Sequence, residues 1–355
     1  VSPEPGLDLC LTLRSDFQRA VNDALAWASR QPSLDFSAGA LVILDARTGA
    51  VLAAGTYPSY NLETFQADFA RLSTDQRSPL LFRPTQAALL TGSVFKLMTA
   101  VVALEEGKIT PSTPFTCARG VRFQSRWFSC PGSHGTVDLL PAIEVSCNSY
   151  FFQVAALLEG TAMARWAHAF GLGVPTGVDL PFEKVGRIPE PGSLLARLNL
   201  AIGQGEMLCT PLQVARMCAA IANGGTLVQP HFMERVVGPD GEAARGFEPR
   251  QQAIAVRPET LHVVREGMHR VVVGPGGTAR AAGLDRFDAA GKTGTAELGA
   301  GRPNHAWFAG FAPYENPKIA FAVVSERTSG HGGSHAVPIA AKALETIWPQ
   351  VERMP

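Results

Sequence analysis

The sequence predicts an α/β fold of the α+β type, in which strands from both ends of the chain form one sheet and helices fill the middle. Two observations lead to this prediction. Strand-like apolar runs occur at residues 39–57 and 304–327, whereas helical patterns broken by Gly and Pro occupy 137–225. Because a sheet must bury a face against another layer, the simplest arrangement inserts the helical block between the two groups of strands.

The first part of the chain predicts a short strand, an amphipathic helix and a hairpin. Apolar and polar residues alternate from Asp8, and apolar residues at helical spacing continue to residue 30. Residues 39–57 hold two apolar runs around Asp45-Ala46-Arg47-Thr48-Gly49, which is typical of a hairpin with a Gly-containing turn. Residues 58–85 have no clear period, and we expect a crossing loop there.

The remaining segments predict mostly core helices and two further strand pairs. Residues 93–106 are apolar nearly all round and precede Gly107, which predicts a buried helix. Residues 231–256 predict a hairpin around Gly238-Pro239-Asp240-Gly241. Helices are expected over 259–273 and about 336–348, and the two strands within 304–327 are expected to flank a turn.

The composition allows a sizeable core and argues against some partners. The chain has 355 residues, of which 46% are hydrophobic, with 31 basic and 31 acidic residues. This balance argues against a nucleic-acid partner, which usually requires a basic excess. No run of 18 apolar residues occurs, so no membrane span is predicted, and the polar start lacks the pattern of a signal peptide. Any N-terminal anchor is therefore expected to lie outside this sequence.

The first candidate motif is Ser93-Val94-Phe95-Lys96. On a helix, positions i and i+3 share a face, and the helix N-terminus favours developing negative charge. Lys96 lies one turn into an apolar helix, where desolvation lowers the pKa of an amine, so Lys96 can take the Ser93 proton. The alternative is a capped helix with a lysine whose ammonium reaches solvent.

The second candidate motif is Ser146-Cys147-Asn148, 53 residues after Ser93. A serine can relay a proton between the lysine and a leaving amine, and the amide of Asn148 offers both a donor and an acceptor to a substrate amide. The alternative is a helix N-cap, a position that Ser and Asn favour in any protein.

The third candidate motif is Lys292-Thr293-Gly294-Thr295, in a segment that suits a strand. Alternation puts Thr293 and Thr295 on one face, where they can bind a carboxylate, and Lys292 and Gly294 on the other. The backbone N–H groups of Thr295 and Ser93 are expected to form an oxyanion hole. Gly294 allows close approach of a helix. The alternative is an exposed lysine before a turn.

The ordered combination of these motifs is known from class A β-lactamases and penicillin-binding proteins. From about residue 6 to 345 the chain resembles the transpeptidase domain of class B penicillin-binding proteins, of the elongation (penicillin-binding protein 2) type. The supporting stretches are Pro5-Gly6-Leu7-Asp8-Leu9, Ala53-Ala54-Gly55-Thr56-Tyr57-Pro58, Gly92-Ser93-Val94-Phe95-Lys96, Ala201-Ile202-Gly203-Gln204-Gly205, Thr210-Pro211-Leu212-Gln213, Gly291-Lys292-Thr293-Gly294-Thr295-Ala296-Glu297 and His305-Ala306-Trp307-Phe308.

The resemblance implies a penicillin-binding/serine β-lactamase-like fold, with an antiparallel five-stranded sheet flanked by helices and an all-helical subdomain. It implies one domain over 1–355, with a sheet subdomain of about 1–85 and 255–355 and a helical subdomain of about 86–254. A membrane anchor and a pedestal domain are expected to be absent from this chain. The expected location is the outer face of the bacterial cytoplasmic membrane, in the periplasm.

The resemblance also implies the reaction. Ser93 is expected to attack the penultimate D-Ala carbonyl of a peptidoglycan stem peptide, and an amine of a second stem resolves the acyl-enzyme. β-Lactam antibiotics are expected to acylate Ser93. A membrane glycosyltransferase of the cell-wall machinery is the expected protein partner. No cofactor is expected for catalysis.

A fourth set of residues suggests a metal. Cys117, Cys130, His134 and Cys147 provide three thiols and an imidazole, a common ligand set for structural zinc, although the 12-residue gaps exceed usual finger spacing. The alternatives are a Cys117–Cys130 disulfide and unpaired small core residues. A further segment, Gly330-His331-Gly332-Gly333-Ser334-His335, is expected to be a flexible loop.

Three other functions compete with the transpeptidase. A serine β-lactamase shares the fold, but Asn148 argues against class D, and none of the Glu residues after the second motif has the class A context. A β-lactam sensor domain would not need a hairpin insertion such as 231–256. The non-enzyme alternative is an idle scaffold of a cell-wall synthesis complex, against which the intact motifs argue.

Overall fold

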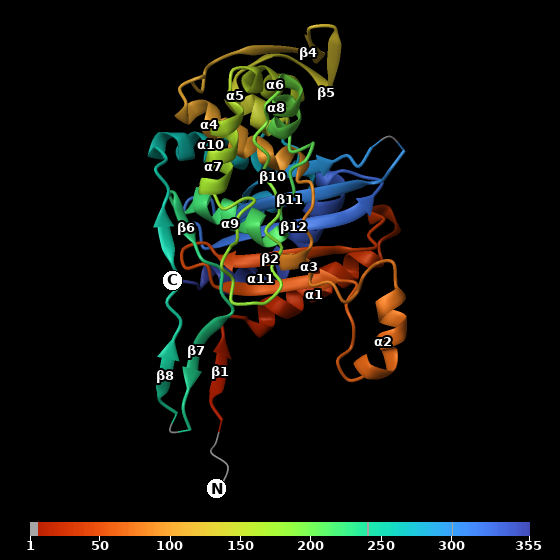
Figure 1. Cartoon of the computed structure of the whole chain (residues 1–355), viewed down its shortest axis with the longest axis vertical. Helices are drawn as coiled ribbons and strands as arrows, with labels where there is room; N and C mark the ends of the chain where they lie inside the picture. Colours follow the sequence, from red (N-terminus) through yellow and green to blue (C-terminus); the bar gives the residue numbers. More distant parts are fainter. Residues whose placement is uncertain (1–5, 240, 300) are drawn as a thin grey trace.

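The computed structural model describes residues 6–239, 241–299 and 301–355. Its centre is a five-stranded antiparallel sheet with the order β10-β11-β12-β2-β3 (Figure 1). These strands span Ala290–Ala296, Asn304–Ala312, Ile319–Thr328, Gly39–Asp45 and Val51–Tyr57. The strands β2 and β3 come from the N-terminal part of the chain and the other three from its C-terminal part, so the prediction of a sheet built from both ends is confirmed.

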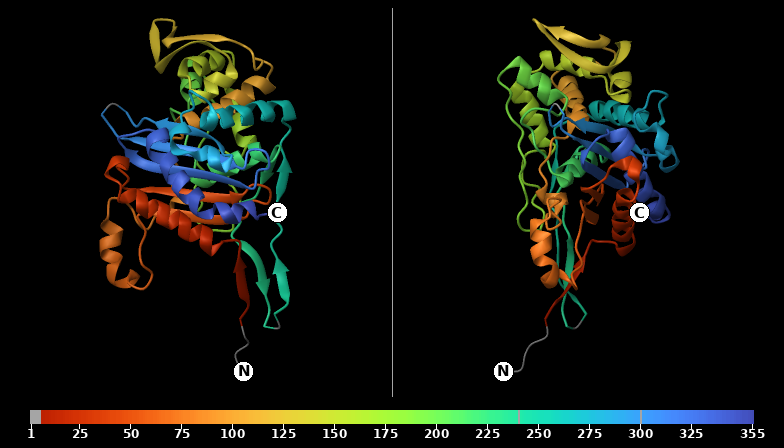
Figure 2. Two further views of the ribbon diagram at one scale, coloured as in Figure 1. Left: turned by 180° about the vertical axis from the view of Figure 1, so that it is seen from behind. Right: turned by 90° about the vertical axis from the view of Figure 1, so that its right-hand side faces the viewer.

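Helices cover both faces of the central sheet. The first and last helices, α1 (Ser15–Ser29) and α11 (Val337–Glu352), contact each other and pack on one face (Figure 2, left). The entirely buried helix α9 (Pro211–Ala222) packs against β2, β11 and β12 on the other face. Strands β2, β11 and β12 are therefore buried almost throughout. Such continuous apolar runs are what a sheet covered on both faces requires.

The middle of the chain forms the helical block, with α10 of the C-terminal part packed against it. The bounds of these helices are Lys96–Glu105 for α4, Leu139–Glu144 for α5, Asn148–Ala156 for α6, Gly160–Ala169 for α7, Leu194–Ala201 for α8 and Pro258–Val273 for α10. Helix α4 contacts α6, α7 and α10, and α10 also contacts β10. The helical block thus meets the sheet next to strand β10.

Interval 86–254 also contains strands, which the expectation of an all-helical subdomain there did not include. The hairpin β4 (Phe115–Phe123) and β5 (Arg126–Val137) lies at the opposite end of the molecule from β1, β7 and β8 (Figure 1). Strands β1 (Asp8–Leu11), β7 (Met233–Val237) and β8 (Ala243–Gly246) form a small sheet, and β6 (Thr226–Val228) pairs with β9 (Gln251–Ala253). The β7–β8 pairing confirms the predicted hairpin. Two residues named in the sequence analysis lie outside the described residues: Asp240 of the hairpin turn, and Pro5 of the stretch 5–9.

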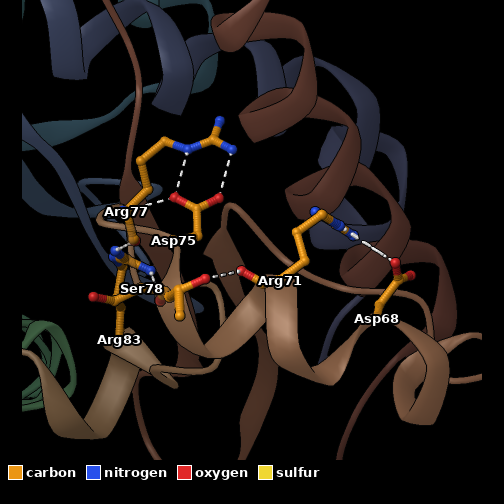
Figure 3. Close-up of polar contacts among 7 residues, drawn as sticks. Asp68, Arg71, Asp75, Arg77, Ser78 and Arg83 are labelled. Carbon is orange, nitrogen blue, oxygen red and sulfur yellow. Dashed lines mark hydrogen bonds and ion pairs between the residues drawn. The ribbon is translucent and has the colours of Figure 1, made fainter.

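Segment 58–85, predicted as a crossing loop, contains the helices α2 (Phe65–Thr74) and α3 (Arg83–Gln86). Helix α2 buries only Leu72, which explains why no apolar period is visible in the sequence. Local ion pairs join Arg71 to Asp68 and Arg77 to Asp75 in this segment (Figure 3).

Arg83 fixes the segment to the sheet. It is 2% exposed, donates to the carbonyl oxygens of Arg77 and Ser78, and pairs with Glu326 of β12 at 2.8 Å (Figure 3 shows the approach to Ser78). Each donor of this buried guanidinium therefore has an acceptor nearby, as burial of a charge requires.

Candidate active site

The predicted motifs meet at one groove. A cavity of about 740 Å³ is lined by Ser93, Ser146, Asn148, Thr293 and Thr295, which come from the three candidate motifs. Lys96 and Lys292 lie behind this lining and are both 0% exposed. The structure therefore brings residues from three distant parts of the sequence to one place.

Ser93 lies on a 3₁₀ turn, η2 (Gly92–Phe95), that leads directly into helix α4. Three residues complete one turn of a 3₁₀-helix, so the side chains of Ser93 and Lys96 follow one another on one side. Gly92 has φ +54°, and a Cβ there would lie 2.2 Å from the carbonyl oxygen of Thr295. Only glycine permits this close approach of the turn to β10.

Lys96 joins the first and second motifs. Its Nζ lies 2.7 Å from the Ser146 carbonyl oxygen, 3.1 Å from Ser146 Oγ and 2.6 Å from Asn148 Oδ1. Among the described residues, Ser93 Oγ has no hydrogen-bond partner, and it is open to the groove. The amine is thus held at the groove by the second motif, while the hydroxyl of the first motif faces the cavity.

Burial sets the protonation of both lysines. Desolvation lowers the pKa of Lys96 from 10.5 to about 7, although negative charge on the nearby sulfurs of Cys130 and Cys147 acts in the opposite direction. Desolvation also lowers the pKa of Lys292, and the neighbouring Lys96 lowers it further. Lys96 therefore exists in both protonation states near neutral pH, as a group that accepts and returns a proton must.

The second motif connects α5 to α6. Ser146 has φ +57°, a left-handed conformation that is costly for a residue with a Cβ. Cys147, and not Ser146, is the N-cap of α6, because its Sγ accepts from the backbone N–H of Tyr150 at 3.4 Å. This geometry differs from the alternative in which Ser146 caps a helix: Ser146 is held in a strained conformation with its Oγ beside Lys96.

The third motif is the edge strand β10. Thr293 and Thr295 line the groove, while Lys292 donates to the Thr293 carbonyl oxygen at 3.1 Å. A Cβ on Gly294 would lie 2.4 Å from the Thr91 carbonyl oxygen, so glycine allows the segment before Ser93 to approach the strand. The predicted alternation of faces along β10 agrees with these contacts.

Several groove residues were not identified from the sequence. Thr278 Oγ1 lies 2.6 Å from Thr293 Oγ1, Gln204 Nε2 donates to the Thr295 carbonyl oxygen at 3.5 Å, and Asn199 lines the cavity. Only Gln204 had a sequence signal, since it lies in the supporting stretch 201–205. The others are isolated polar residues without a recognisable spacing.

The segment 330–335, which was expected to be a flexible loop, contains a helical turn. Gly332–Ala336 form a π-helical turn before α11, and His331 and Gly332 line the groove. The Gly332 N–H donates to Thr295 Oγ1 at 3.4 Å, and the His335 ring is buried against Ser334 Oγ at 2.7 Å. This turn therefore forms the part of the groove wall that contacts β10.

The four predicted metal ligands converge. Their ligand atoms, from Cys117, Cys130, His134 and Cys147, all lie within 4.8 Å of one another. His134 Nδ1 is 3.5 Å from the Cys117 sulfur and 3.6 Å from the Cys130 sulfur. All six cysteines of the chain are free, so the alternative Cys117–Cys130 disulfide is absent from the structure. The Cys147 thiol lies near the Cys130 sulfur, and this proximity lowers the pKa of Cys130.

The comparisons with known proteins agree with this architecture. The family described as penicillin binding protein transpeptidase domain matches residues 39–345. The chain belongs to this family, because the match covers most of its length. It is similar to the peptidoglycan D,D-transpeptidase MrdA of Haemophilus influenzae, with 30% identity over 98% of this chain and 58% of that protein. The chain thus spans little more than half the length of that relative.

Two solved structures illustrate the likeness. The ceftriaxone acyl-enzyme complex of penicillin-binding protein A from Mycobacterium tuberculosis has a TM-score of 0.85 and 30% identity, covering 96% of this chain and 80% of that one. A structure described as the structural coordination of polymerization and crosslinking by a peptidoglycan synthase complex has a TM-score of 0.86 and 32% identity, covering 98% and 64% of the two chains.

Proposed function

We propose that this chain is the catalytic domain of a peptidoglycan D,D-transpeptidase and that Ser93 is its nucleophile. The observation that carries the proposal is the buried Lys96 amine, whose pKa is lowered to about 7 and which lies between Ser146 Oγ and Asn148 Oδ1 at the groove. A neutral amine at this place can deprotonate a serine hydroxyl at physiological pH. Family membership and the D,D-transpeptidase name of the Haemophilus relative support the same activity.

In the proposed acylation, Lys96 takes the Ser93 proton, and Ser93 Oγ attacks the carbonyl carbon of the penultimate D-Ala. The backbone N–H groups of Ser93 and Thr295 stabilise the oxyanion. Ser146 passes the proton from Lys96 to the departing amine, so the C–N bond breaks and D-Ala leaves neutral at its nitrogen. Thr293 and Thr295 bind the terminal carboxylate, near the Lys292 amine.

In the proposed deacylation, an amine of a second stem peptide attacks the ester on Ser93. The amine loses a proton through Ser146 to Lys96 while a new amide bond forms, and Ser93 Oγ regains a proton as it leaves. Asn148 holds a substrate amide, and Gly294 keeps the strand close to the Ser93 turn. The acylation steps also account for reaction with β-lactams. The solved structure of the Mycobacterium relative is such an acyl-enzyme, formed with ceftriaxone.

Labelling with fluorescent penicillin tests the proposal. The protein should acquire one label, located at Ser93 by peptide mass spectrometry, and Ser93→Ala should acquire none. Unlabelled wild type would reject the activity and favour the idle scaffold. Rapid turnover of a chromogenic cephalosporin would instead show a β-lactamase, and a stable acyl-enzyme without D-Ala release from peptide would favour a β-lactam sensor.

The location and partner of the domain are also proposals. No helix in the described part of the chain is long and apolar enough to cross a membrane. We propose that the domain works in the periplasm, at the outer face of the cytoplasmic membrane, anchored by an N-terminal helix outside this sequence. The likeness to a chain of a peptidoglycan synthase complex supports a membrane glycosyltransferase as partner. Within the domain, we propose the sheet subdomain (about 1–85 and 255–355) and the helical subdomain (about 86–254).

We further propose that the cluster of Cys117, Cys130, His134 and Cys147 holds a structural zinc ion. The three sulfurs and one imidazole nitrogen, all within 4.8 Å of one another, fit a four-coordinate site that is closed to substrate. Zinc would tie the β4–β5 hairpin to the N-terminus of α6, on which Asn148 lies. Elemental analysis of protein purified without chelator should give one zinc per chain, and less than a stoichiometric amount would reject the site.

A further inference from the structure

A second cavity adjoins the groove and has a different chemistry. Its volume is about 620 Å³, and it shares Gln204, Gly205, Glu297 and Gly299 with the groove. Beyond these shared residues, its wall includes Arg302 and Arg327, which do not line the groove. A peptide that occupies the groove can therefore extend into a space bordered by two guanidinium groups.

Both arginines are available to a ligand. Their side chains are exposed, and neither guanidinium has an ion pair or a hydrogen bond to any described residue. The carboxylate next to Arg327 in sequence, Glu326, is already paired with Arg83 at 2.8 Å. The remaining carboxylate, Glu297, lies at the boundary between the two cavities, so the far wall carries the positive charge.

The backbone holds both arginines beside the cavity. Arg327 has φ +52°, and its N–H donates to His305 Nδ1 at 3.3 Å. Arg302 lies in the β10–β11 connection, where its N–H donates to the Gly299 carbonyl oxygen at 3.1 Å. Arg302 thus lies just before β11 and Arg327 near the end of β12, and these adjacent strands are paired as far as Asn304 and Thr328.

Strand β10 indicates which part of a substrate reaches this cavity. It is an edge strand, and an extended peptide commonly binds such an edge as an additional strand. The donor is the stem peptide that loses its terminal D-Ala. If its terminal carboxylate lies near Thr293 and the peptide pairs antiparallel to β10, the rest of the peptide runs from there past Thr295 towards Glu297 and Gly299. The residue that precedes D-Ala-D-Ala then lies at the boundary of the second cavity.

We propose that Arg302 and Arg327 form a subsite for a side-chain carboxylate of the donor stem peptide, located at the residue that precedes D-Ala-D-Ala. This inference rests on the proposed transpeptidase function, because it assumes that the donor is bound along β10. Arginine suits the task, since its planar group stays charged and can bind a carboxylate through two parallel hydrogen bonds.

A competition assay tests the subsite without requiring turnover. Two synthetic peptides ending in D-Ala-D-Ala, identical except for a carboxylate or a primary amide on the preceding side chain, compete with fluorescent penicillin for Ser93. In wild type the peptide with the side-chain carboxylate should compete at a concentration about tenfold lower than the peptide with the amide. The reason is that the carboxylate gains charged contacts with two exposed guanidinium groups, those of Arg302 and Arg327. The preference should shrink as salt is added, since exposed charges are screened.

Variants assign the preference to the two arginines. The double variant Arg302→Gln/Arg327→Gln should bring the ratio of the two peptides close to one, while the double Lys variant should keep part of it. Arg245→Gln is the matched control, because Arg245 is an exposed arginine on β8, in the small sheet formed with β1 and β7. A wild-type ratio of one, absence of competition by either peptide, or an unchanged ratio in the double Gln variant would overturn the subsite. Failure of penicillin to label wild-type Ser93 would overturn the proposed function instead.

Discussion

The pH dependence of acylation follows from the environment of Lys96. Its pKa is lowered from 10.5 to about 7 by complete burial, which corresponds to roughly 5 kcal/mol against the ammonium form. If the neutral amine is the base, the rate of acylation by penicillin should rise through an apparent pKa near 7 and level off by about pH 8.5. At pH 5.5 only about 3% of the amine is neutral, so the rate should be ~30-fold below the plateau.

Stopped-flow measurement of labelling between pH 5.5 and 9 checks this prediction. Lys96→Arg should abolish acylation at every pH, because a guanidinium stays protonated and cannot accept the proton. Lys108→Arg is the control, since Lys108 is exposed just beyond α4 and should leave the profile unchanged. A rate that does not vary between pH 5.5 and 8.5, or normal acylation by Lys96→Arg, would refute the role of the buried amine.

The same burial links stability to pH. Between about pH 7 and 10.5 the folded protein keeps Lys96 neutral while the unfolded chain binds a proton there, so this group makes the folded state more stable as pH rises through that window. Lys96→Met should weaken this increase of the unfolding free energy with pH, measured by denaturant unfolding at several pH values. Two further changes act on packing. Gly92→Ala places a Cβ about 2.2 Å from the Thr295 carbonyl oxygen at a positive φ, so both the melting temperature and penicillin labelling should fall; unchanged labelling would contradict the argument. Arg83→Ala should lower the free energy of unfolding by about 3–5 kcal/mol, because Glu326 loses its partner, and Arg83→Ala/Glu326→Ala should recover part of the loss. Equal losses in the single and double variants would argue against the pair.

The sequence predicted the parts of the fold that carry strong apolar signals. Helix α1 was predicted because it buries a regular apolar face, and the β2–β3 hairpin and the two strands around residue 315 because each strand is a nearly continuous apolar run. The hairpin β4–β5 was not, since its strands hold few fully buried residues and register shifts between Cys117 and Gly120 interrupt the alternation of β4. Helix α2 was missed for a similar reason, as it buries one residue.

The candidate site was predictable where residues form short local motifs. Ser93 and Lys96 are one helical turn apart, and Thr293 and Thr295 are two residues apart on one strand and therefore share a face. Local chain geometry alone thus places each pair together. Thr278 reaches the groove only through tertiary folding, and its contact with Thr293 Oγ1 could not be inferred from spacing. The cavity bordered by Arg302 and Arg327 likewise depends on the β10–β11 connection and the end of β12, which meet only in the folded chain, so no pattern in the sequence reveals it.

The order of strands in the central sheet has a consequence for how the chain is made. Strand β2 pairs with β12, so that Gly39 faces Ser325, 286 positions later. During synthesis the β2–β3 hairpin emerges early but cannot complete its sheet until nearly the whole chain has left the ribosome. Such non-local pairing slows folding and leaves apolar edges uncovered in the meantime. A chain truncated before β12 should therefore leave one edge of β2 without its partner strand and aggregate, even though every residue of the three motifs is present.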